Sequence, residues 1–304
     1  MKARSLGYRL LGRGFDYLLH LRPAEWPIMA VHFLTGSALS IGLSGILQGE
    51  GGVSLWIGTI GFVIGINGGT LALNSAFDRD EGDIAYLRKP PPPPPALALF
   101  GLTLMGAALF AGLSLPRPFL GAAALCAVLS VLYSVPPVRL KAVAGFDWLI
   151  NMAGFGFLTP YAGWALTGRD VAGPGLVVLI SFGFLFGALY PLTQLYQLEE
   201  DSRRGDRTLA VWLGINRSLG TSVAMAMLAF AGFGFAGLGS GWEGLGAVAR
   251  WAGLLAAAAA WLVVLLPWWR DREVMDAASH QAGMHRALAA WAVTDMAVLF
   301  AWAR

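Results

Sequence analysis

The sequence predicts an all-helical protein that crosses a membrane many times, and three observations lead to that prediction. Of its 304 residues, 57% are hydrophobic and only 13% are charged, about half the charged share of a soluble domain. The mean hydropathy is +0.63. The charged residues gather in short stretches that separate apolar runs of about 20 residues, the length that crosses a bilayer core. These features exclude a soluble enzyme, a disordered chain and a nucleic-acid-binding protein.

Nine segments have the length and apolarity of a membrane span. The predicted spans are residues 26–48, 53–77, 96–114, 118–135, 147–167, 174–196, 218–239, 246–268 and 284–303. Residues 1–25 form a basic arm that we expect on the membrane surface, and residues 26–304 form a single transmembrane domain. Within it, the spacing of four between Gly61, Gly65 and Gly69 predicts close packing of helices in lipid.

Lysine and arginine residues predict the orientation of these spans. With nine spans, 17 of the 21 Lys and Arg residues fall on the same side as the N-terminus. Positive residues collect on the cytoplasmic side of membrane proteins. We therefore expect a multi-pass protein of the cell inner membrane, with its N-terminus cytoplasmic and its C-terminus extracytoplasmic.

Eight of the 18 acidic residues lie in two clusters, within residues 78–83 and 199–206. Both clusters follow predicted spans at their cytoplasmic ends, and four spans separate them, as an internal duplication would place them. Asn74 and Asp78 share a helix face, as do Gln197 and Asp201. Two such faces that point at each other would bind Mg²⁺, which prefers one or two carboxylates completed by water or phosphate oxygens.

The loop from Tyr133 to Lys141 lies between these clusters in the sequence and brings a phenol and two cations, Arg139 and Lys141. Carboxylates for a metal together with interleaved cations suit a diphosphate substrate. Two other readings remain open. The acidic residues are solvated loop charges, or the protein is a secondary transporter, whose coupling residues would lie near the centres of helices.

Three segments, in order, resemble motifs of the UbiA superfamily of intramembrane prenyltransferases. Asn74-Ser-Ala-Phe-Asp78-Arg-Asp80-Glu-Gly-Asp83 resembles the first aspartate motif. Tyr133-Ser-Val-Pro-Pro-Val-Arg-Leu-Lys141, followed by Asp147 and Asn151, resembles the central Tyr-Ser-x-Pro-Pro segment. Asp201-Ser-Arg-Arg-Gly205-Asp-Arg-Thr208-Leu is similar to the second aspartate motif, and Arg22-Pro-x-x-Trp26 also fits the family. The likeness covers about residues 20 to 215.

The resemblance implies nine transmembrane helices in a bundle around a central cavity, capped on the cytoplasmic side by the motif loops. It also implies transfer of an isoprenoid chain from its diphosphate to an aromatic or other lipophilic acceptor, with Mg²⁺ as cofactor. An isoprenoid cyclase or a carotenoid elongase of the same superfamily is the alternative.

Carried over by position, the motifs give a set of candidate residues. The expected catalytic residues are Asp78, Asp201, Lys141 and Tyr133. The expected metal-binding residues are Asp78, Asp83, Asn74, Glu200 and Asp201. The expected substrate-binding residues are Asn74, Arg139, Arg22, Arg88, Lys89 and Asn151. Two positions depart from the family pattern, because Gly82 and Gln197 stand where it usually has aspartate. Asp83 and Glu200 are the neighbouring carboxylates that would replace them.

Several further residues have both a functional and a structural reading. Phe77, Phe155 and Phe157 would shelter a carbocation or simply pack in the bundle. Asp295, in the last predicted span, is a functional candidate or a hydrogen-bonded structural residue. The histidines have no metal-site spacing, and residues 90–95 form a stiff polyproline spacer or a docking site.

Overall fold

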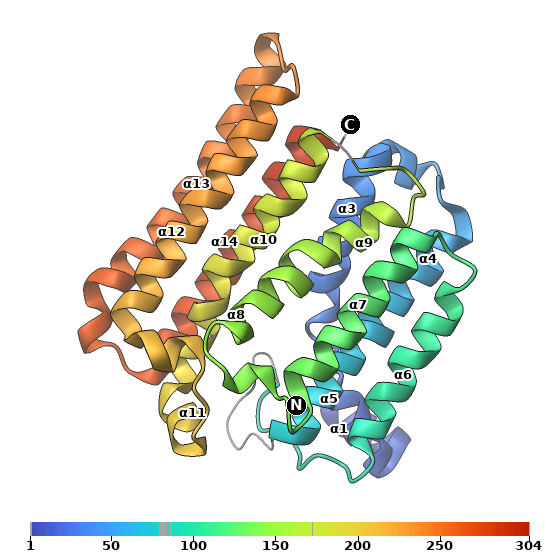
Figure 1. Cartoon of the computed structure of the whole chain (residues 1–304), viewed down its shortest axis with the longest axis vertical. Coiled ribbons are helices and arrows are strands. Elements are labelled where there is room, and N and C mark those ends of the chain that lie inside the picture. Colours follow the sequence, from blue (N-terminus) through green and yellow to red (C-terminus); the bar gives the residue numbers. More distant parts are fainter. Residues whose placement is uncertain (1, 79–83, 85–86, 172, 304) are drawn as a thin grey trace.

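The computed structural model is helical throughout the residues that it describes, which are all except 1, 79–83, 85–86, 172 and 304. Within those residues, β-structure is limited to two isolated bridges. Figure 1 shows a bundle of long helices, with α1 (Lys2–Leu11) at one end and the last residues of α14 (Ala277–Trp302) at the other. The predicted all-helical class is confirmed.

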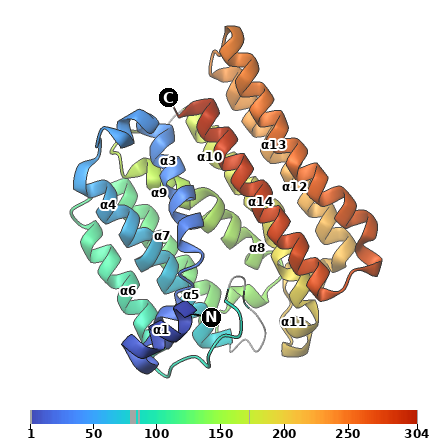
Figure 2. The same cartoon turned by 180° about the vertical axis from the view of Figure 1, so that it is seen from behind.

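The helices form two half-bundles, each with its own apolar core. The first half contains α3 (Trp26–Leu47), α4 (Gly52–Ile60), η2 (Gly61–Gly68), α5 (Gly69–Asp78), α6 (Leu97–Gly112), α7 (Arg117–Ser134), α8 (Phe146–Asn151), η4 (Met152–Leu158) and α9 (Thr159–Ala165). The second half contains α10 (Pro174–Gln194), α11 (Leu198–Arg204), α12 (Leu209–Gly239), α13 (Gly244–Asp271) and α14. Figure 2 shows α4 to α7 on one side of the molecule and α12 to α14 on the other.

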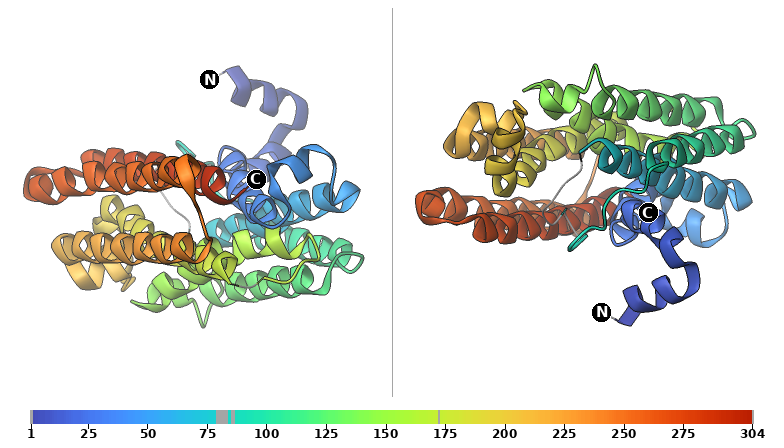
Figure 3. Two further views of the ribbon diagram at one scale, coloured as in Figure 1. Left: turned by 90° about the horizontal axis from the view of Figure 1, so that it is seen from above. Right: turned by 90° about the horizontal axis from the view of Figure 1, so that it is seen from below.

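The basic arm folds into α1 and a short helix, α2 (Phe15–His20), before α3 begins. Figure 3 shows α1 standing off the side of the bundle. The Arg4 guanidinium donates to the backbone carbonyls of Arg88 and Lys89, each at 3.0 Å, and the His20 ring nitrogen Nε2 lies 3.1 Å from the Pro91 carbonyl. The start of the polyproline segment therefore contacts the N-terminal arm, which is consistent with a structural spacer.

Close glycine packing is found where the spacing predicted it. A Cβ atom added to Gly65 would lie 2.5 Å from the Ala108 Cβ, and one added to Gly69 would lie 2.7 Å from the Gly101 carbonyl oxygen. Both distances are too short for a side chain, so η2 and α5 approach α6 almost backbone to backbone. Gly61 is less tightly placed, because its added Cβ would meet Ala108 at 3.9 Å.

Six helical stretches are long and apolar enough to cross a membrane by length and composition. They are residues 26–47, 52–78, 117–134, 173–204, 209–239 and 244–274. The other three predicted spans coincide with helical segments that fall outside this set, at residues 97–112, 146–165 and 277–302. An integral membrane protein is indicated by these apolar helices, and the count of nine crossings stays a prediction.

Two predicted helix starts are displaced: the last helix begins at Ala277 rather than at residue 284, and the other displacement is larger. The helix expected from residue 218 begins at Leu209, because the Thr208 hydroxyl caps it by accepting from the Val211 backbone N–H at 3.4 Å. This early part is separated from the rest by Gly214, whose φ of +71° breaks the helix. The polar residues Asn216 and Arg217 kept residues 209–217 out of the apolar window, so hydropathy alone missed them.

Two π-helical segments, η2 and η4, interrupt the longer helices of the first half. Such segments often occur at functional sites because they widen a helix locally and turn side chains out of register. Phe62, Ile66 and Asn67 of η2 and Phe155 of η4 line the cavity described below. The irregular turns therefore shape the wall of that cavity.

Candidate active site

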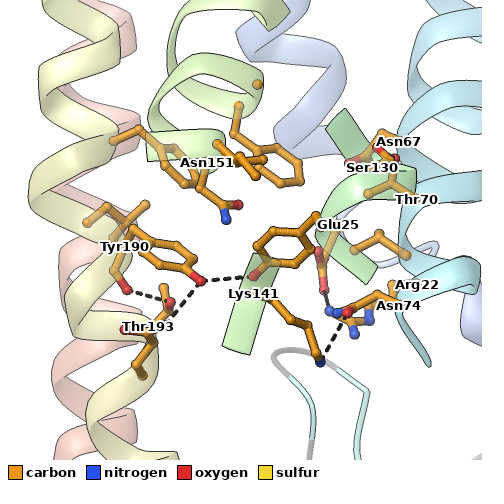
Figure 4. Close-up of a pocket in the computed structure, with 18 of the residues that line it drawn as sticks. Arg22, Glu25, Asn67, Thr70, Asn74, Ser130, Lys141, Asn151, Tyr190 and Thr193 are labelled. Carbon is orange, nitrogen blue, oxygen red and sulfur yellow. Dashed lines mark hydrogen bonds and ion pairs between the residues drawn. The ribbon is translucent and has the colours of Figure 1, made fainter. Parts of the chain in front are cut away.

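Residues from both half-bundles line a cavity of about 330 Å³. Figure 4 shows Asn67, Thr70 and Asn74 on one wall and Tyr190 on the other, with Lys141 at the lower end. The lower end continues into the charged residues described next. The remaining wall is mostly apolar and includes Phe62, Leu129, Phe155, Phe186, Leu189 and Trp291. The cavity thus has one strongly charged end and a hydrophobic interior.

The first acidic motif lies at the end of α5. Asp78 is 8% exposed, and its Oδ1 contacts the Lys141 ammonium and lies 3.7 Å from Nη2 of Arg139. The same Lys141 ammonium lies 3.4 Å from the Asn74 Oδ1, one helical turn earlier. The structure therefore brings Asn74, Asp78 and Lys141 together at the charged end.

Arg139 joins the central loop to the start of α12. Its guanidinium makes two parallel hydrogen bonds to the Asp206 carboxylate, of which Nη2 to Oδ2 is 3.0 Å long. These bonds raise the pKa of Arg139 above its ordinary value. Nearby, the Arg207 backbone N–H donates to the Ala142 carbonyl at 3.2 Å. The central loop and the second acidic motif are therefore held directly against each other.

The second acidic motif lies on α11. Asp201 is 6% exposed and accepts from Nη2 of Arg204 at 2.9 Å and from the Thr208 hydroxyl at 3.4 Å. Arg204 also lies 3.6 Å from the Glu200 carboxylate and donates to the Asp78 backbone carbonyl at 3.4 Å. Arg204 thus links the second motif to the first, and the charged end alternates carboxylates with cations.

A buried hydrogen-bond network adjoins the charged end of the cavity. The Asp147 carboxylate, 0% exposed, accepts from the Leu209 backbone N–H at 2.8 Å and from Nε2 of Gln194 at 2.8 Å. The Tyr190 hydroxyl accepts from the same Gln194 nitrogen at 3.1 Å and lies 2.8 Å from the Tyr133 hydroxyl. The network fixes α8, α10 and the start of α12 relative to one another.

Arg22 and Glu25 form a buried pair beside the charged end, with 3.8 Å between Nη1 and Oε1 (Figure 4). Arg22 is 8% exposed, and its Nε and Nη2 have no hydrogen-bond partner among the described residues. Burial raises the pKa of Glu25 above its ordinary value, and the charge of Arg22 partly offsets this. Arg22 lines the cavity and has donor atoms that the described residues leave unused, and its role in substrate binding stays a prediction.

Other expected residues lie elsewhere. Arg88 and Lys89 are exposed, do not line the cavity, and contribute their backbone carbonyls to the contact with Arg4. Asn151 does line the cavity and donates to the Asp147 carbonyl at 2.8 Å. Glu200 contacts Arg204 but does not line the cavity. Asp83 lies outside the described residues.

Of the three candidate aromatic residues, one lines the cavity and two do not. Phe155 lines the cavity and stacks on Phe186, with ring centroids 5.4 Å apart. Phe157 stacks on Tyr161 at 5.6 Å, and Phe77 packs against the core of the first half; neither lines the cavity. Of the three, Phe155 is the one placed to meet a substrate.

Several polar residues of the cavity are not predicted by the motifs, and two of them stand out. Asp206 belongs to the second acidic cluster, where no role is predicted for it, although it is the main partner of Arg139. Asn67 is 3% exposed, lines the cavity, and has no hydrogen-bond partner for either amide atom among the described residues. Its spacing of seven and eleven from Asn74 and Asp78 puts all three on one helix face, a signal that was available in the sequence.

An apolar helical bundle around a cavity with alternating carboxylates and cations at one end has the shape and charge to bind an anionic, lipophilic molecule. Residues 34–291 match the UbiA prenyltransferase family, and the chain belongs to that family. No curated protein matches the sequence.

Solved structures show the same fold. A UbiA homologue from Archaeoglobus fulgidus bound to DMAPP and Mg²⁺ has 18% identity and a TM-score of 0.70, over 92% of this chain and 99% of that one. The same homologue bound to GPP and Mg²⁺ also has 18% identity, with a TM-score of 0.65 and the same coverage. A digeranylgeranylglyceryl phosphate synthase has 14% identity and a TM-score of 0.67, over 94% of this chain and 97% of that one.

Proposed function

We propose that the protein is a Mg²⁺-dependent prenyltransferase that moves an isoprenoid chain from its diphosphate to a lipophilic acceptor. The observation behind this proposal is the charged end of the cavity, where two acidic motifs 123 residues apart meet the cations of the central loop. An apolar interior adjoins that end and suits the hydrocarbon part of the donor. The homologue structures bound to DMAPP or GPP with Mg²⁺ support the same assignment.

The residues present fit a magnesium ion that is bound partly by the protein and partly by the diphosphate of the substrate. Asn74, Asp78 and Asp201 line the charged end and offer the oxygen atoms that Mg²⁺ prefers. Among the described residues, no three His, Cys, Asp or Glu side chains are grouped closely enough to hold a metal alone. This arrangement suits Mg²⁺, which keeps part of its shell for water or phosphate oxygens. Asp83 and Glu200 stay proposed as additional ligands.

The ion pairs at the charged end of the cavity indicate how a metal diphosphate would bind there. Asp78 is paired with Lys141, Asp206 with Arg139, and Asp201 with Arg204. A metal diphosphate brings positive charge for the carboxylates and negative oxygens for the cations, so each pair exchanges one partner for another. The charged end therefore needs no unpaired buried charge either before or after binding.

The cations of the central loop would then assist loss of the diphosphate. Bound Mg²⁺ would supply electrostatic stabilisation of the leaving diphosphate oxygens. Lys141 and Arg139, released from their carboxylate partners, would stabilise the same developing negative charge. Tyr133 would add a hydroxyl donor, which its contact with Tyr190 holds at the cavity wall.

The cavity interior would protect the allylic cation from water. Its wall is apolar, and the Phe155 and Phe186 rings are stacked 5.4 Å apart. Aromatic faces attract cations, and a dry site prevents hydrolysis. The predicted orientation would place the charged end at the cytoplasmic face of the inner membrane, where soluble isoprenyl diphosphates can reach it.

An activity assay with purified protein tests the proposal. The assay contains Mg²⁺, one isoprenyl diphosphate (DMAPP, GPP or a longer chain) and one of a panel of aromatic and lipid acceptors. We expect a prenylated product and stoichiometric pyrophosphate with at least one pair. Asp201→Asn should abolish both, whereas the exposed Asp271→Asn should not. Pyrophosphate release without any prenylated acceptor would instead favour a cyclase, and no release with any donor would refute the proposal.

A further inference from the structure

The apolar interior of the cavity contains a second polar site, formed by His32 of α3 and Asp295 of α14. Their side chains are 4% and 3% exposed, and the His32 ring nitrogen Nδ1 lies 3.2 Å from the Asp295 Oδ1. The two residues are 263 positions apart in the chain, and they join the first half-bundle to the second. His32 lines the cavity together with Met29, Phe62, Phe186 and Trp291.

Aromatic neighbours fix the orientation of the His32 ring. Its centroid lies 4.9 Å from that of Phe182 and 4.9 Å from that of Trp291, with interplanar angles of 77° and 73°. Phe182 and Trp291 also contact each other, at 5.9 Å between centroids. The ring is therefore held by edge-to-face contacts on two sides and by Asp295 at Nδ1, and the direction of Nε2 is set by the protein.

Nε2 of His32 is buried and has no hydrogen-bond partner among the described residues. A buried polar atom without a partner costs free energy, and most such atoms in proteins are satisfied by a ligand, a water or another side chain. A purely structural tie between α3 and α14 needs only the Nδ1 contact. Nε2 is therefore a hydrogen-bonding atom that the protein leaves unused on a residue of the cavity wall.

We propose that His32, positioned by Asp295, binds the hydroxyl group of the acceptor substrate. The inference rests on the proposed prenyl transfer, and it narrows the acceptor to a hydroxyl-bearing lipophilic molecule, such as a phenol or a quinol, rather than a hydrocarbon. Nδ1 faces an Asp295 carboxylate oxygen, which accepts, so Nδ1 carries the ring hydrogen. Nε2 is then the ring nitrogen left to form a hydrogen bond with the hydroxyl group of the acceptor.

This assignment gives the two ends of the cavity different tasks. The charged end binds the diphosphate of the donor, and His32 orients the polar group of the acceptor within the apolar interior. A hydrocarbon acceptor would leave Nε2 without a partner, so binding it would cost free energy that binding a hydroxylated acceptor recovers.

Binding of three small aromatic probes tests the proposal without knowledge of the natural acceptor. The probes are 1-naphthol, 1-methoxynaphthalene and 1-naphthoate, titrated into the full-length protein in one detergent. We expect naphthol to bind at least tenfold more tightly than its methyl ether. His32→Phe keeps a ring of similar size, removes Nε2, and should bring that ratio close to one.

His280→Phe is the matched control. His280 is also buried on α14, its Nδ1 accepts from the Trp268 indole at 2.9 Å, and its Nε2 has no partner among the described residues. It does not line the cavity. We therefore expect this variant to keep the wild-type naphthol preference, even if it unfolds at a lower temperature.

The possible outcomes are distinct. A naphthol preference that is absent in the wild type, or that survives His32→Phe, overturns the proposal. Tighter binding of naphthoate than of naphthol also overturns it, because that result would assign the site to a carboxylate rather than a hydroxyl group. The His32→Phe protein should still bind GPP in the presence of Mg²⁺, which shows that it is folded. Loss of the naphthol preference with intact GPP binding supports the proposal, whereas absence of GPP binding in the wild type refutes the proposed function itself.

Discussion

Asp147 is the buried carboxylate whose loss should destabilise the protein most clearly. It is 0% exposed and accepts from Nε2 of Gln194 and from the Leu209 backbone N–H, both at 2.8 Å, as well as from the Gly145 N–H at 2.9 Å. Hydrogen bonds to a charged group contribute roughly 1.5–3 kcal/mol each. Asp147→Ala removes all three bonds. The two fully buried ones alone, from Gln194 and Leu209, should lower the free energy of unfolding by about 3–6 kcal/mol.

Asp147→Asn should cost less, because it keeps one acceptor oxygen. That oxygen can still face Gln194 and Leu209, but the amide group would meet the Gly145 N–H donor to donor. We expect a loss of roughly 1.5–3 kcal/mol, the value of one charge-assisted bond. The order of stability is therefore wild type, then Asp147→Asn, then Asp147→Ala.

Unfolding in mixed detergent micelles of rising SDS content, followed by tryptophan fluorescence, measures these differences. Asp271, which lies 2.8 Å from Arg270 and is screened by solvent, provides the control, since a surface ion pair of this kind contributes little to stability. The reasoning is refuted if Asp147→Ala shifts the unfolding free energy by no more than Asp271→Ala does.

Three other variants test separate parts of the structure. Lys141→Met removes the cation that contacts Asp78, so the Kd for GPP with Mg²⁺ should rise at least tenfold in a filter-binding assay, while exposed Arg203→Met leaves it unchanged. Gly69→Val places a branched side chain against the α6 backbone and should lower the unfolding free energy by about 1–3 kcal/mol, measured as above; an unchanged value would contradict the close packing. Arg4→Ala removes two hydrogen bonds to residues 88 and 89 and should speed hydrogen exchange there without altering GPP binding.

The helical membrane class, and the placement of Asn74 and Asp78 on one helix face, were predictable from the sequence for a physical reason. Long apolar runs have one stable solution in lipid, the helix, so composition alone indicates the fold class. Asn74 and Asp78 lie one helical turn apart, and local geometry puts them on one face whatever the tertiary structure. The helix start at Leu209 was missed because a polar cap and a kink at Gly214, rather than hydropathy, define it.

The partners of these residues were not predictable, because tertiary packing brings them together across long separations. Arg139 and Asp206 are 67 residues apart, as are Lys141 and Asn74. The sequence gives no measure of such distances without an alignment of relatives. His32 and Asp295 show the same limit: each is a lone polar residue in an apolar run, and only the packing of α3 against α14 makes them a pair.

The central claim is that the two acidic motifs and the loop cations form one Mg²⁺-dependent diphosphate site. Equilibrium binding of GPP to the purified protein, with Mg²⁺ and with EDTA, tests it most directly. The account predicts binding that requires Mg²⁺ in the wild type and weakens at least tenfold in both Asp78→Asn and Asp201→Asn. GPP binding that is equally tight in EDTA, or that neither substitution weakens, would contradict it.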